Sequence, residues 1–324
     1  MRPIKIENEE VWVLDQRLLP TREKWIKISS VEDAYKAIKM MVVRGAPLIG
    51  VVAAYGLALS AKKVKDASEY IKIGEWLKTA RPTAINLMWA VDRVLNSSKD
   101  KISFVKAWEE ASKIFNEELD NARRIGEKGE PLFNDGDTVL THCNAGALAT
   151  VDYGTALAPL RIAKERGKKI KVFATETRPV MQGARLTTYE LAKDGFDVTL
   201  IADTAVGLTM MKGYIKKVIV GADRVLKDGT TLNKIGTFQV ATLAKRFNIP
   251  FYVALPSSTL DLKSQVDDVI IEQRPPEEIF YIKGKRIAPR GIKAFNPAFD
   301  ITPPELITAI ITEKGVYYPP FNFT

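Results

Sequence analysis

The sequence predicts an α/β protein in which a mostly helical N-terminal domain precedes a domain built on a parallel sheet. Two observations predict this division. Residues 31–119 place apolar side chains three and four positions apart, which is typical of amphipathic helices. From Thr138 onward, short β-branched apolar runs alternate with helical segments, as in parallel strands covered on both faces. We therefore expect a Rossmann-like parallel sheet in the C-terminal domain.

The N-terminal domain is expected to span residues 1–125. It begins with KIENEEVWVLDQRL (5–18), whose alternating pattern predicts a short β section. The polar, glycine-containing stretch RRIGEKGEPLFNDGD (123–137) indicates a boundary, so the second domain is expected over 126–324. Helices are expected over 31–43, 50–63, 82–97 and 104–119, with Gly45, Pro47 and Pro82 as breaks.

Six apolar runs are expected to be strands of the C-terminal domain. They are TVLTH, IKVFAT, VTLIAD, VIVGAD, FYVALP and DVIIEQ, with helices around 146–166, 182–194, 205–213 and 233–247. In an open α/β sheet the carboxyl ends of the strands form the edge where ligands bind. Polar residues follow five of the runs there: His142, Cys143 and Asn144; Glu176, Thr177 and Arg178; Asp203 and Thr204; Asp223 and Arg224; Ser257 and Ser258. Helix capping and loop solvation are the alternative reasons for such residues.

Composition excludes several classes of protein. The 324 residues contain one cysteine and one histidine, so neither an internal disulfide nor a zinc cluster is expected, and no metal site is predicted. The net charge of +9 is spread among glutamates, which favours a solvated surface or an anionic substrate over nucleic acid. Neither GxxxxGK[ST] nor a strand-linked GxGxxG is present, so no nucleotide cofactor is expected.

The chain is expected to be cytoplasmic. Its N-terminus, MRPIKIENEEVW, lacks the apolar core of a signal peptide. The apolar run VVAAYGLALSA is short and interrupted by glycine, which favours a buried helix over a membrane span. Many lysines and glutamates, with few cysteines and histidines, indicate a thermophilic source.

The only histidine and the only cysteine are neighbours in THCNAG (141–146). A Cys-His hydrolase is not expected, because neighbouring side chains on an extended strand point to opposite faces. His142 is expected to be a packed, hydrogen-bonded histidine. Cys143 precedes NAGALAT, a small-residue turn expected to lead into a helix whose N-terminus favours a thiolate. A buried structural cysteine is the alternative.

Asp223 is the best partner for Cys143, because it follows the apolar run VIVGA at another strand end. A desolvated carboxylic acid there could donate a proton near neutral pH. A thiolate that takes a proton beside an acid that gives one suits the transfer of hydrogen between adjacent carbons. A structural ion pair between Asp223 and Arg224 is the alternative.

Seven segments, in order, resemble the methylthioribose-1-phosphate isomerase family over nearly the whole chain. They are VVRGAPLIGVVAAYGLAL, ARPTAINLMWAVDR, LTHCNAGALAT, ETRPVMQGARLTTYEL, VIVGADRV, GTTLNKIGTFQVA and FNPAFDITPPELITAIITEKG. This family is related to ribose-1,5-bisphosphate isomerases and to the α, β and δ regulatory subunits of eukaryotic initiation factor two-B. The resemblance implies a homodimer and a reaction of methionine salvage without cofactor or metal.

The resemblance also implies roles for individual residues. Cys143 and Asp223 match the family's catalytic pair. The substrate-binding positions matched by motif are Arg44, Gly45, Ala46, Arg81, Gln182, Asn233 and Lys234. Arginines and a glycine-opened backbone suit a phosphate, while Asn and Gln suit sugar hydroxyls. Surface salt bridges, turns and capping are the alternative roles.

The implied reaction converts 5-methylthioribose 1-phosphate to 5-methylthioribulose 1-phosphate. The hypothesis is that Asp223 protonates the ring oxygen and Cys143 takes the proton from carbon 2; a direct hydride shift is the competing route. Two alternative functions stay open. One is a related isomerase acting on ribose 1,5-bisphosphate or 5-deoxyribose 1-phosphate, and the other is a non-catalytic regulatory subunit that binds a translation partner.

Overall fold

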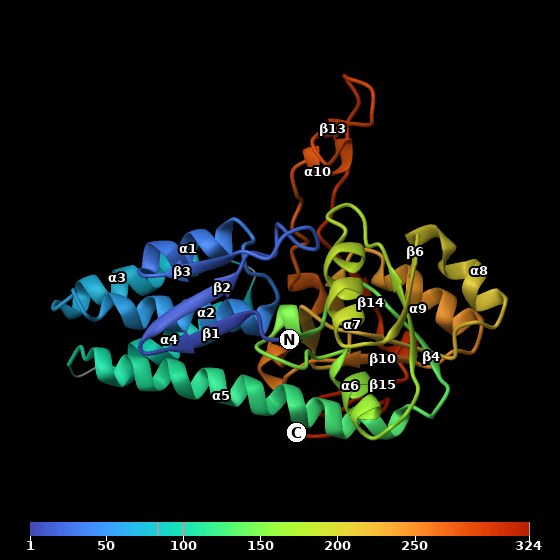
Figure 1. The fold of residues 1–324 in the computed structure, drawn as a ribbon, viewed down its shortest axis with the longest axis horizontal. Helices are drawn as coiled ribbons and strands as arrows, with labels where there is room; N and C mark the ends of the chain where they lie inside the picture. The colour runs from blue at the N-terminus through green and yellow to red at the C-terminus, as the bar shows by residue number, and fades with distance from the viewer. Residues whose placement is uncertain (83, 99–100, 324) are drawn as a thin grey trace.

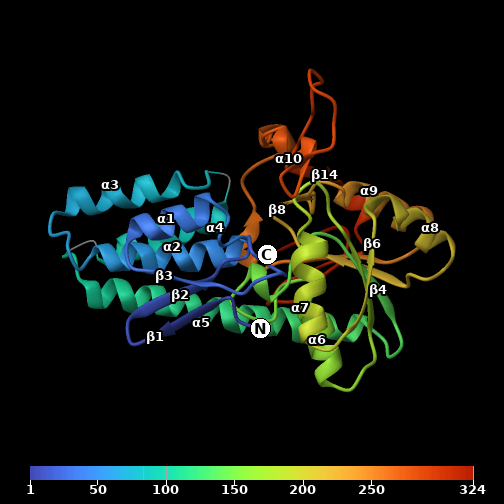
Figure 2. The ribbon, with the colours of Figure 1, turned by 45° about the horizontal axis from the view of Figure 1, so that its top comes forward.

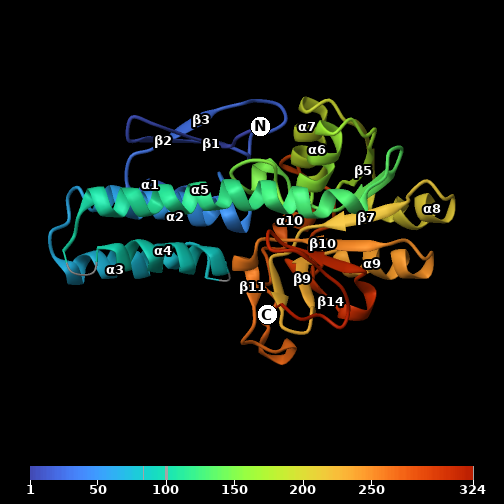
Figure 3. The same cartoon turned by 90° about the horizontal axis from the view of Figure 1, so that it is seen from below.

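The computed structural model describes residues 1–82, 84–98 and 101–323. A helical half and a sheet-containing half lie side by side along the longest axis of the molecule (Figure 1). Helix α5 (Phe104–Gly129) begins in the first half and runs along the underside of the second, so it lies in front when the molecule is seen from below (Figure 3). Among the described residues, no helix combines the length and the apolar character that crossing a membrane requires.

The helical half is organised around α2 (Ala46–Ser60). This helix is apolar on all sides and nearly every residue in it is buried, because α1, α4 and α5 pack around it. A small antiparallel sheet, ordered β1-β2-β3, covers this half. The remaining elements are β1 (Ile4–Glu7), β2 (Glu10–Leu14), β3 (Trp25–Ile28), α1 (Val31–Lys39), α3 (Ala67–Lys78) and α4 (Ile85–Ser97).

The structure confirms the β section and the four expected helices of this half, with different ends. The second helix begins at Ala46 rather than residue 50, directly after the Gly45 break. The helix expected from residue 82 begins at Ile85, and Thr83 lies outside the described residues. Helix α3 was not predicted.

The stretch expected to be a boundary is largely helical. Helix α5 continues to Gly129, so RRIGEKG forms its last turns rather than a linker. Its glycines permit close packing, since a Cβ at Gly126 would lie 2.7 Å from Ile162 Cγ1 of α6 (Ala158–Glu165). A helix is therefore shared by the two halves, and the division at residues 125 and 126 stays a prediction.

The second half contains a seven-stranded sheet ordered β16-β15-β10-β7-β4-β5-β6. All of its strand pairs are parallel except β15 with β16. Its first six strands along the chain have the spatial order 3-2-1-4-5-6, which confirms the expected Rossmann-like sheet. The strands are β4 (Thr138–Thr141), β5 (Lys171–Thr175), β6 (Asp197–Ile201), β7 (Lys217–Val220), β10 (Phe251–Ala254), β15 (Ala309–Ile311) and β16 (Val316–Tyr317).

Alternate side chains of these strands enter two separate cores, as the pleat of a strand requires. Val139 and Ile219 face a core that includes α6 and the end of α5, whereas Leu140 and Val218 face a core formed with the opposite helices. Helix α7 (Thr188–Lys193) joins the first core, and α8 (Val206–Met211) and α9 (Thr237–Arg246) form the second. The two sets of helices lie on opposite sides of the sheet (Figure 2).

A second sheet, ordered β11-β8-β9-β14, lies at the carboxyl edge of the main sheet, because β8 starts directly after Asp223. Its strands are β8 (Arg224–Leu226), β9 (Thr231–Lys234), β11 (Leu260–Asp261) and β14 (Phe299–Thr302). Beyond it an arm projects from the molecule (Figure 1). The arm carries α10 (Glu277–Phe280), β12 (Tyr281–Ile282) and β13 (Lys285–Arg286).

Three expectations for this half are wrong. The run DVIIEQ forms no strand of the sheet, and its Ile270 is 89% exposed; the sixth strand is β15 instead. The helix expected over 146–166 is limited to α6 and one 3-10 turn, Ala147–Ala149. The helix expected from residue 233 begins at Thr237, because Asn233 and Lys234 belong to β9.

The packing of α2 leads to a stability prediction. A Cβ at Gly56 would lie 2.3 Å from the Ala34 Cβ of α1, whereas one at Gly207 of α8 would meet no atom closer than 3.8 Å. We expect Gly56→Ala to lower the free energy of unfolding by about 1–3 kcal/mol. Gly207→Ala, the matched control, should leave it unchanged or raise it by up to about 1 kcal/mol. Urea denaturation measures both, and equal stability of the two variants would contradict this account of the packing.

Candidate active site

The predicted catalytic residues follow two neighbouring strands. Strand β4 pairs with β7, but the chain continues from β4 toward β5 and from β7 toward β10, on opposite sides. The crevice at such a reversal of strand order is where open α/β sheets bind ligands. Cys143 lies two residues beyond β4, and Asp223 lies three residues beyond β7. The topology therefore brings both residues to one crevice.

A cleft of about 360 Å³ opens at this crevice and is lined by both halves of the molecule. Within the described part of the chain, no group of three or more His, Cys, Asp and Glu side chains is arranged to hold a metal ion. Eight of the nine predicted site residues line the cleft: Arg44, Gly45, Ala46, Arg81, Cys143, Gln182, Asp223 and Lys234. The ninth, Asn233, lines an adjoining cavity of about 40 Å³ that shares Arg44, Cys143 and Asp223 with the cleft.

Cys143 is held in a conformation that non-glycine residues seldom adopt, with φ of 64°. Its backbone N–H donates to Thr177 Oγ1 at 2.9 Å, and its carbonyl accepts from Thr187 Oγ1 at 2.6 Å. Thr177 follows β5, and Thr187 is the last residue of the helical turn Gly183–Thr187. No α-helix starts at NAGALAT, so the expected helix N-terminus beside the thiol is wrong.

His142 is fully engaged elsewhere and is not a base for Cys143. Its Nε2 lies 2.9 Å from the carbonyl of Ile235, which can only accept, so Nε2 carries the proton. Its Nδ1 then accepts from Thr175 Oγ1 at 2.7 Å, and Thr175 accepts from Thr177 Oγ1 at 3.1 Å. Burial lowers the pKa of His142, which keeps the ring neutral. The packed role expected for this residue agrees with these contacts.

The Asp223 carboxyl group has no hydrogen-bond or ion-pair partner among the described residues, although the backbone N–H of Asp223 donates to the Leu232 carbonyl at 2.9 Å. Arg224, the partner considered from the sequence, forms its ion pair with Asp261 at 3.4 Å. The structural Asp223–Arg224 pair is therefore absent from the part of the chain that the structure describes, and the Asp223 side chain lines the cleft.

The cations that line the cleft include Arg44, Arg81 and Lys234, which lie close enough to one another to interact electrostatically. Among the described residues the Arg81 guanidinium has no hydrogen-bond or ion-pair partner. Burial lowers the pKa of Arg81, and the nearby Asp223 opposes this shift. Burial also lowers the pKa of Lys234, against the influence of Cys143 and Asp223, while its Nζ donates to the Ala298 carbonyl at 2.8 Å. Positive charge without carboxylate partners favours an anionic ligand.

The loop before α2 adds backbone donors to these cations. Gly45 is the residue that precedes the helix; it has φ of 90°, and an added Cβ would lie 2.2 Å from the Ala149 carbonyl oxygen. Only glycine fits this approach. Among the described residues no side chain caps the helix, and Gly45 and Ala46 line the cleft, so the positive end of the helix dipole lies at the cleft. Pro47 has no N–H, which leaves the Ala46 N–H as the first donor of this turn.

Two glutamines present buried carbonyl oxygens without a hydrogen-bond partner in the described part of the chain: Gln16 and Gln182 Oε1. Both side chains line the cleft. Gln16 Nε2 donates to the Leu148 carbonyl at 2.7 Å, which fixes the orientation of its amide. The sequence did not identify Gln16, because DQRL follows β2 without a recognisable motif. Gln16 is recognised by its buried Oε1 atom without a hydrogen-bond partner, a feature that is visible only in the folded structure.

The position of Cys143 predicts its reactivity. Its side chain is only 7% exposed, but it lines the cleft. We expect iodoacetamide to attach one label per native chain at Cys143, more slowly than to an unfolded chain, because access is through the cleft. Mass spectrometry of native and denatured protein measures this. Labelling that occurs only after denaturation would indicate a structural cysteine.

Comparison with known proteins relates this geometry to a family. Residues 42–319 match the Initiation factor 2 subunit family. The methylthioribose-1-phosphate isomerase of Thermosipho africanus is 54% identical, over 97% of this chain and 94% of the relative. A putative methylthioribose-1-phosphate isomerase of Methanocaldococcus jannaschii is 53% identical, over 98% of this chain and 96% of the relative.

Two solved structures are similar over nearly the whole chain. The 5-methylthioribose 1-phosphate isomerase from Pyrococcus horikoshii has a TM-score of 0.91 and 42% identity, covering 99% of this chain and 93% of that one. The translation initiation factor eIF-2B, subunit delta, from A. fulgidus has a TM-score of 0.88 and 47% identity, covering 99% of this chain and 96% of that one. The chain belongs to the Initiation factor 2 subunit family.

Proposed function

We propose that this protein is an aldose-ketose isomerase that converts 5-methylthioribose 1-phosphate to 5-methylthioribulose 1-phosphate in methionine salvage. One observation carries the proposal. A carboxyl group without a partner among the described residues and the only thiol of the chain meet in a cleft rich in positive charge. The names of relatives at 53–54% identity support the same reading.

Arg44, Arg81 and the N-terminus of α2 would bind the substrate phosphate. The Arg81 guanidinium, for which no partner is found among the described residues, suits a doubly charged group. The backbone N–H of Ala46, at the start of α2, supplies a further donor, whereas Pro47 after it has no N–H. Lys234 is also in the cleft and contributes positive charge beside Asp223.

The remaining wall suits a sugar that ends in a methylthio group. The Oε1 atoms of Gln16 and Gln182 can accept hydrogen bonds from sugar hydroxyls, which would satisfy two buried acceptors. Asn233, in the adjoining cavity, is a further candidate for the sugar. Apolar side chains that also line the cleft can accommodate a thioether: Met41, Ile49, Val180, Leu186, Val269 and Phe299.

The chemistry follows from the two groups at the strand ends. The bond between carbon 1 and the ring oxygen breaks as Asp223 donates its proton to that oxygen. The Cys143 thiolate takes the proton from carbon 2, which gives an enol phosphate. The thiol then returns a proton to carbon 1 as the carbon 2 hydroxyl gives its proton to the Asp223 carboxylate. Both side chains end the cycle in their starting states. A hydride shift from carbon 2 to carbon 1 is the competing route.

A non-catalytic role in a translation complex is the second candidate, because a solved structure at 47% identity bears the name of an initiation factor subunit. A surface that only binds another protein requires neither a carboxyl group without a partner, such as that of Asp223, nor buried carbonyl oxygens without a hydrogen bond in a cleft. The polar groups of Gln16, Gln182 and Asp223, unpaired among the described residues, therefore favour a small polar ligand over a purely protein-binding role.

The proposed function is tested by incubating purified protein, without added cofactor, with three substrates. They are 5-methylthioribose 1-phosphate, 5-deoxyribose 1-phosphate and ribose 1,5-bisphosphate. We expect the methylthio sugar to give the highest kcat/KM, measured by NMR of the ketose product. Preference for another sugar would support the related-isomerase alternative. No turnover of any of them would contradict the catalytic function.

Asp223→Asn is expected to abolish turnover while the protein still folds and binds substrate. The change keeps the shape of the side chain but removes the transferable proton. Asp228→Asn, an exposed aspartate in the turn after β8, is the matched control and should keep wild-type turnover. Turnover of Asp223→Asn within a few-fold of wild type would refute the acid role.

We also propose a homodimer, as the family resemblance implies. Large apolar side chains in the segments before and after the elements of the arm are exposed, including Ile270 at 89% and Phe295 at 77%. Exposed apolar surface of this kind is typical of protein contact sites. Light scattering should then give twice the chain mass of 36.1 kDa, and a monomer mass would contradict the proposal.

A cytoplasmic location and a thermophilic source are proposed as well. The chain has a single cysteine and is rich in lysine and glutamate. A melting temperature within the mesophilic range of about 45–65 °C would contradict the thermophilic source.

A further inference from the structure

A buried chain of polar contacts leads from Arg44, the proposed phosphate ligand, into the second half of the molecule. Arg44 Nη1 donates to Asn144 Oδ1, and its Nη2 donates to the Asn144 backbone carbonyl at 2.8 Å. Asn144 Nδ2 in turn donates to Glu190 Oε1 at 2.5 Å. Asn144 is 3% exposed and Glu190 is completely buried, so water does not replace these contacts.

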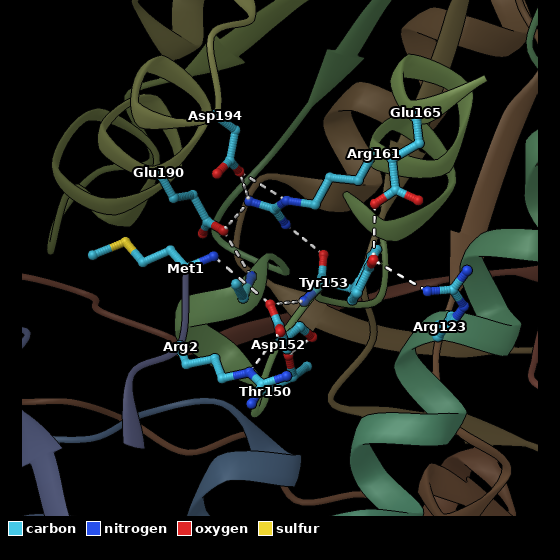
Figure 4. Close-up of polar contacts among 11 residues, drawn as sticks. Met1, Arg2, Arg123, Thr150, Asp152, Tyr153, Arg161, Glu165, Glu190 and Asp194 are labelled. Carbon is cyan, nitrogen blue, oxygen red and sulfur yellow. Dashed lines mark hydrogen bonds and ion pairs between the residues drawn. The ribbon is translucent and has the colours of Figure 1, made fainter. Parts of the chain in front are cut away.

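Glu190 is itself held from two further sides. Its Oε2 accepts from the Ala147 N–H and from Arg161 Nη2, each at 2.7 Å. Arg161 also donates to Asp194 through Nε at 2.8 Å and to the Tyr153 carbonyl (Figure 4). A Cβ at Gly146 would lie 2.2 Å from both carboxylate oxygens, so the glycine provides the space that this carboxylate occupies.

The donors and acceptors in this chain of contacts permit one arrangement. An ionised carboxylate only accepts, so Glu190 requires the NH2 group of Asn144 on its side. The Asn144 oxygen is then left facing Arg44, whose guanidinium only donates. A flipped Asn144 amide would set oxygen against carboxylate and NH2 against guanidinium. Thr187 Oγ1, 3.1 Å from Asn144 Nδ2, takes the second amide hydrogen.

We propose that Glu190 is a positioning residue for substrate binding: through the Asn144 amide it fixes the Arg44 guanidinium at the phosphate site. Glu190 does not line the cleft and touches no reacting atom. The inference rests on the proposed function, in which Arg44 binds the phosphate of a sugar phosphate. It adds a residue from α7 that is distant in sequence from the arginine that it orients.

The test exchanges hydrogen-bond donor and acceptor at the contact between Asn144 and Glu190. In Glu190→Gln an amide NH2 can face the Asn144 amide NH2, and in Asn144→Asp two carboxylates face each other. We expect each variant to raise the KM for 5-methylthioribose 1-phosphate on the order of tenfold, with a smaller change in kcat.

The double variant, Asn144→Asp with Glu190→Gln, restores the match between donor and acceptor. The amide introduced at position 190 can donate its NH2 to the carboxylate introduced at position 144, and that carboxylate still accepts from Arg44. The KM of the double variant should therefore return to within about threefold of wild type.

Asp152→Asn is the matched control. Asp152 forms ion pairs with Arg2 and the N-terminal amine, near Glu190 (Figure 4), and makes no polar contact with Asn144 or Arg44 among the described residues. This variant should keep the wild-type KM even if it lowers Tm. Glu190→Gln with an unchanged KM, or a double variant whose KM reflects the sum of the two single effects, would overturn the proposal.

A second measurement separates this proposal from the proposed function. Binding of inorganic phosphate, followed by calorimetry, should weaken in both single variants and recover in the double variant, whether or not the protein turns over a sugar. Wild-type protein without isomerase activity would refute the function, while the phosphate titrations would still decide the role of Glu190. Should a single variant fail to fold, Gly146→Ala displaces the same carboxylate without a change of charge and should weaken phosphate binding. Unchanged phosphate affinity in Gly146→Ala would then overturn the proposal.

Discussion

The pairing of β4 with β7 is the constraint on which the site depends. Val139 lies opposite Lys217 and Leu140 opposite Val218, so the two strands end at nearly the same level of the sheet. The chain leaves them in opposite directions, and the helices that follow therefore do not close the space between their ends. The helical half closes that space instead, with Arg44, Arg81 and the N-terminus of α2. The proposed phosphate site on one half thus faces a carboxyl group and a thiol on the other.

Groups around the cleft differ in how firmly the protein holds them. The backbone of Cys143 has an unfavourable left-handed conformation, maintained by hydrogen bonds from Thr187 and to Thr177. Arg44 is fixed by a buried polar chain that ends in an ion pair. By contrast, three other groups proposed to meet the substrate lack partners among the described residues: the Asp223 carboxyl and the Oε1 atoms of Gln16 and Gln182. A rigidly held backbone and guanidinium beside polar groups without partners are the arrangement expected of a preorganised site.

Local sequence patterns predicted the parallel sheet, because strands buried on both faces are continuously apolar and the helices between them are not. The same criterion failed for DVIIEQ, since an apolar run that lines a cleft resembles a buried strand. NAGALAT was wrongly expected to start a helix. Its small residues serve close packing instead: Gly146 adjoins the Glu190 carboxylate, and a Cβ at Gly154 would lie 2.5 Å from Gly146 Cα. Motifs identified eight of the residues that line the cleft. Gln16 and Glu190 were missed, because their contacts join positions 132 and 46 residues apart.

The most direct test of this account is a crystal structure of the Asp223→Asn protein with 5-methylthioribose 1-phosphate. The account predicts the phosphate against Arg44, Arg81 and the first turn of α2. The ring oxygen should lie next to residue 223, and carbon 2 should lie about 3.5 Å from Cys143 Sγ. A sugar bound at another edge of the sheet, or in the cleft with its phosphate away from Arg44 and Arg81, would contradict it.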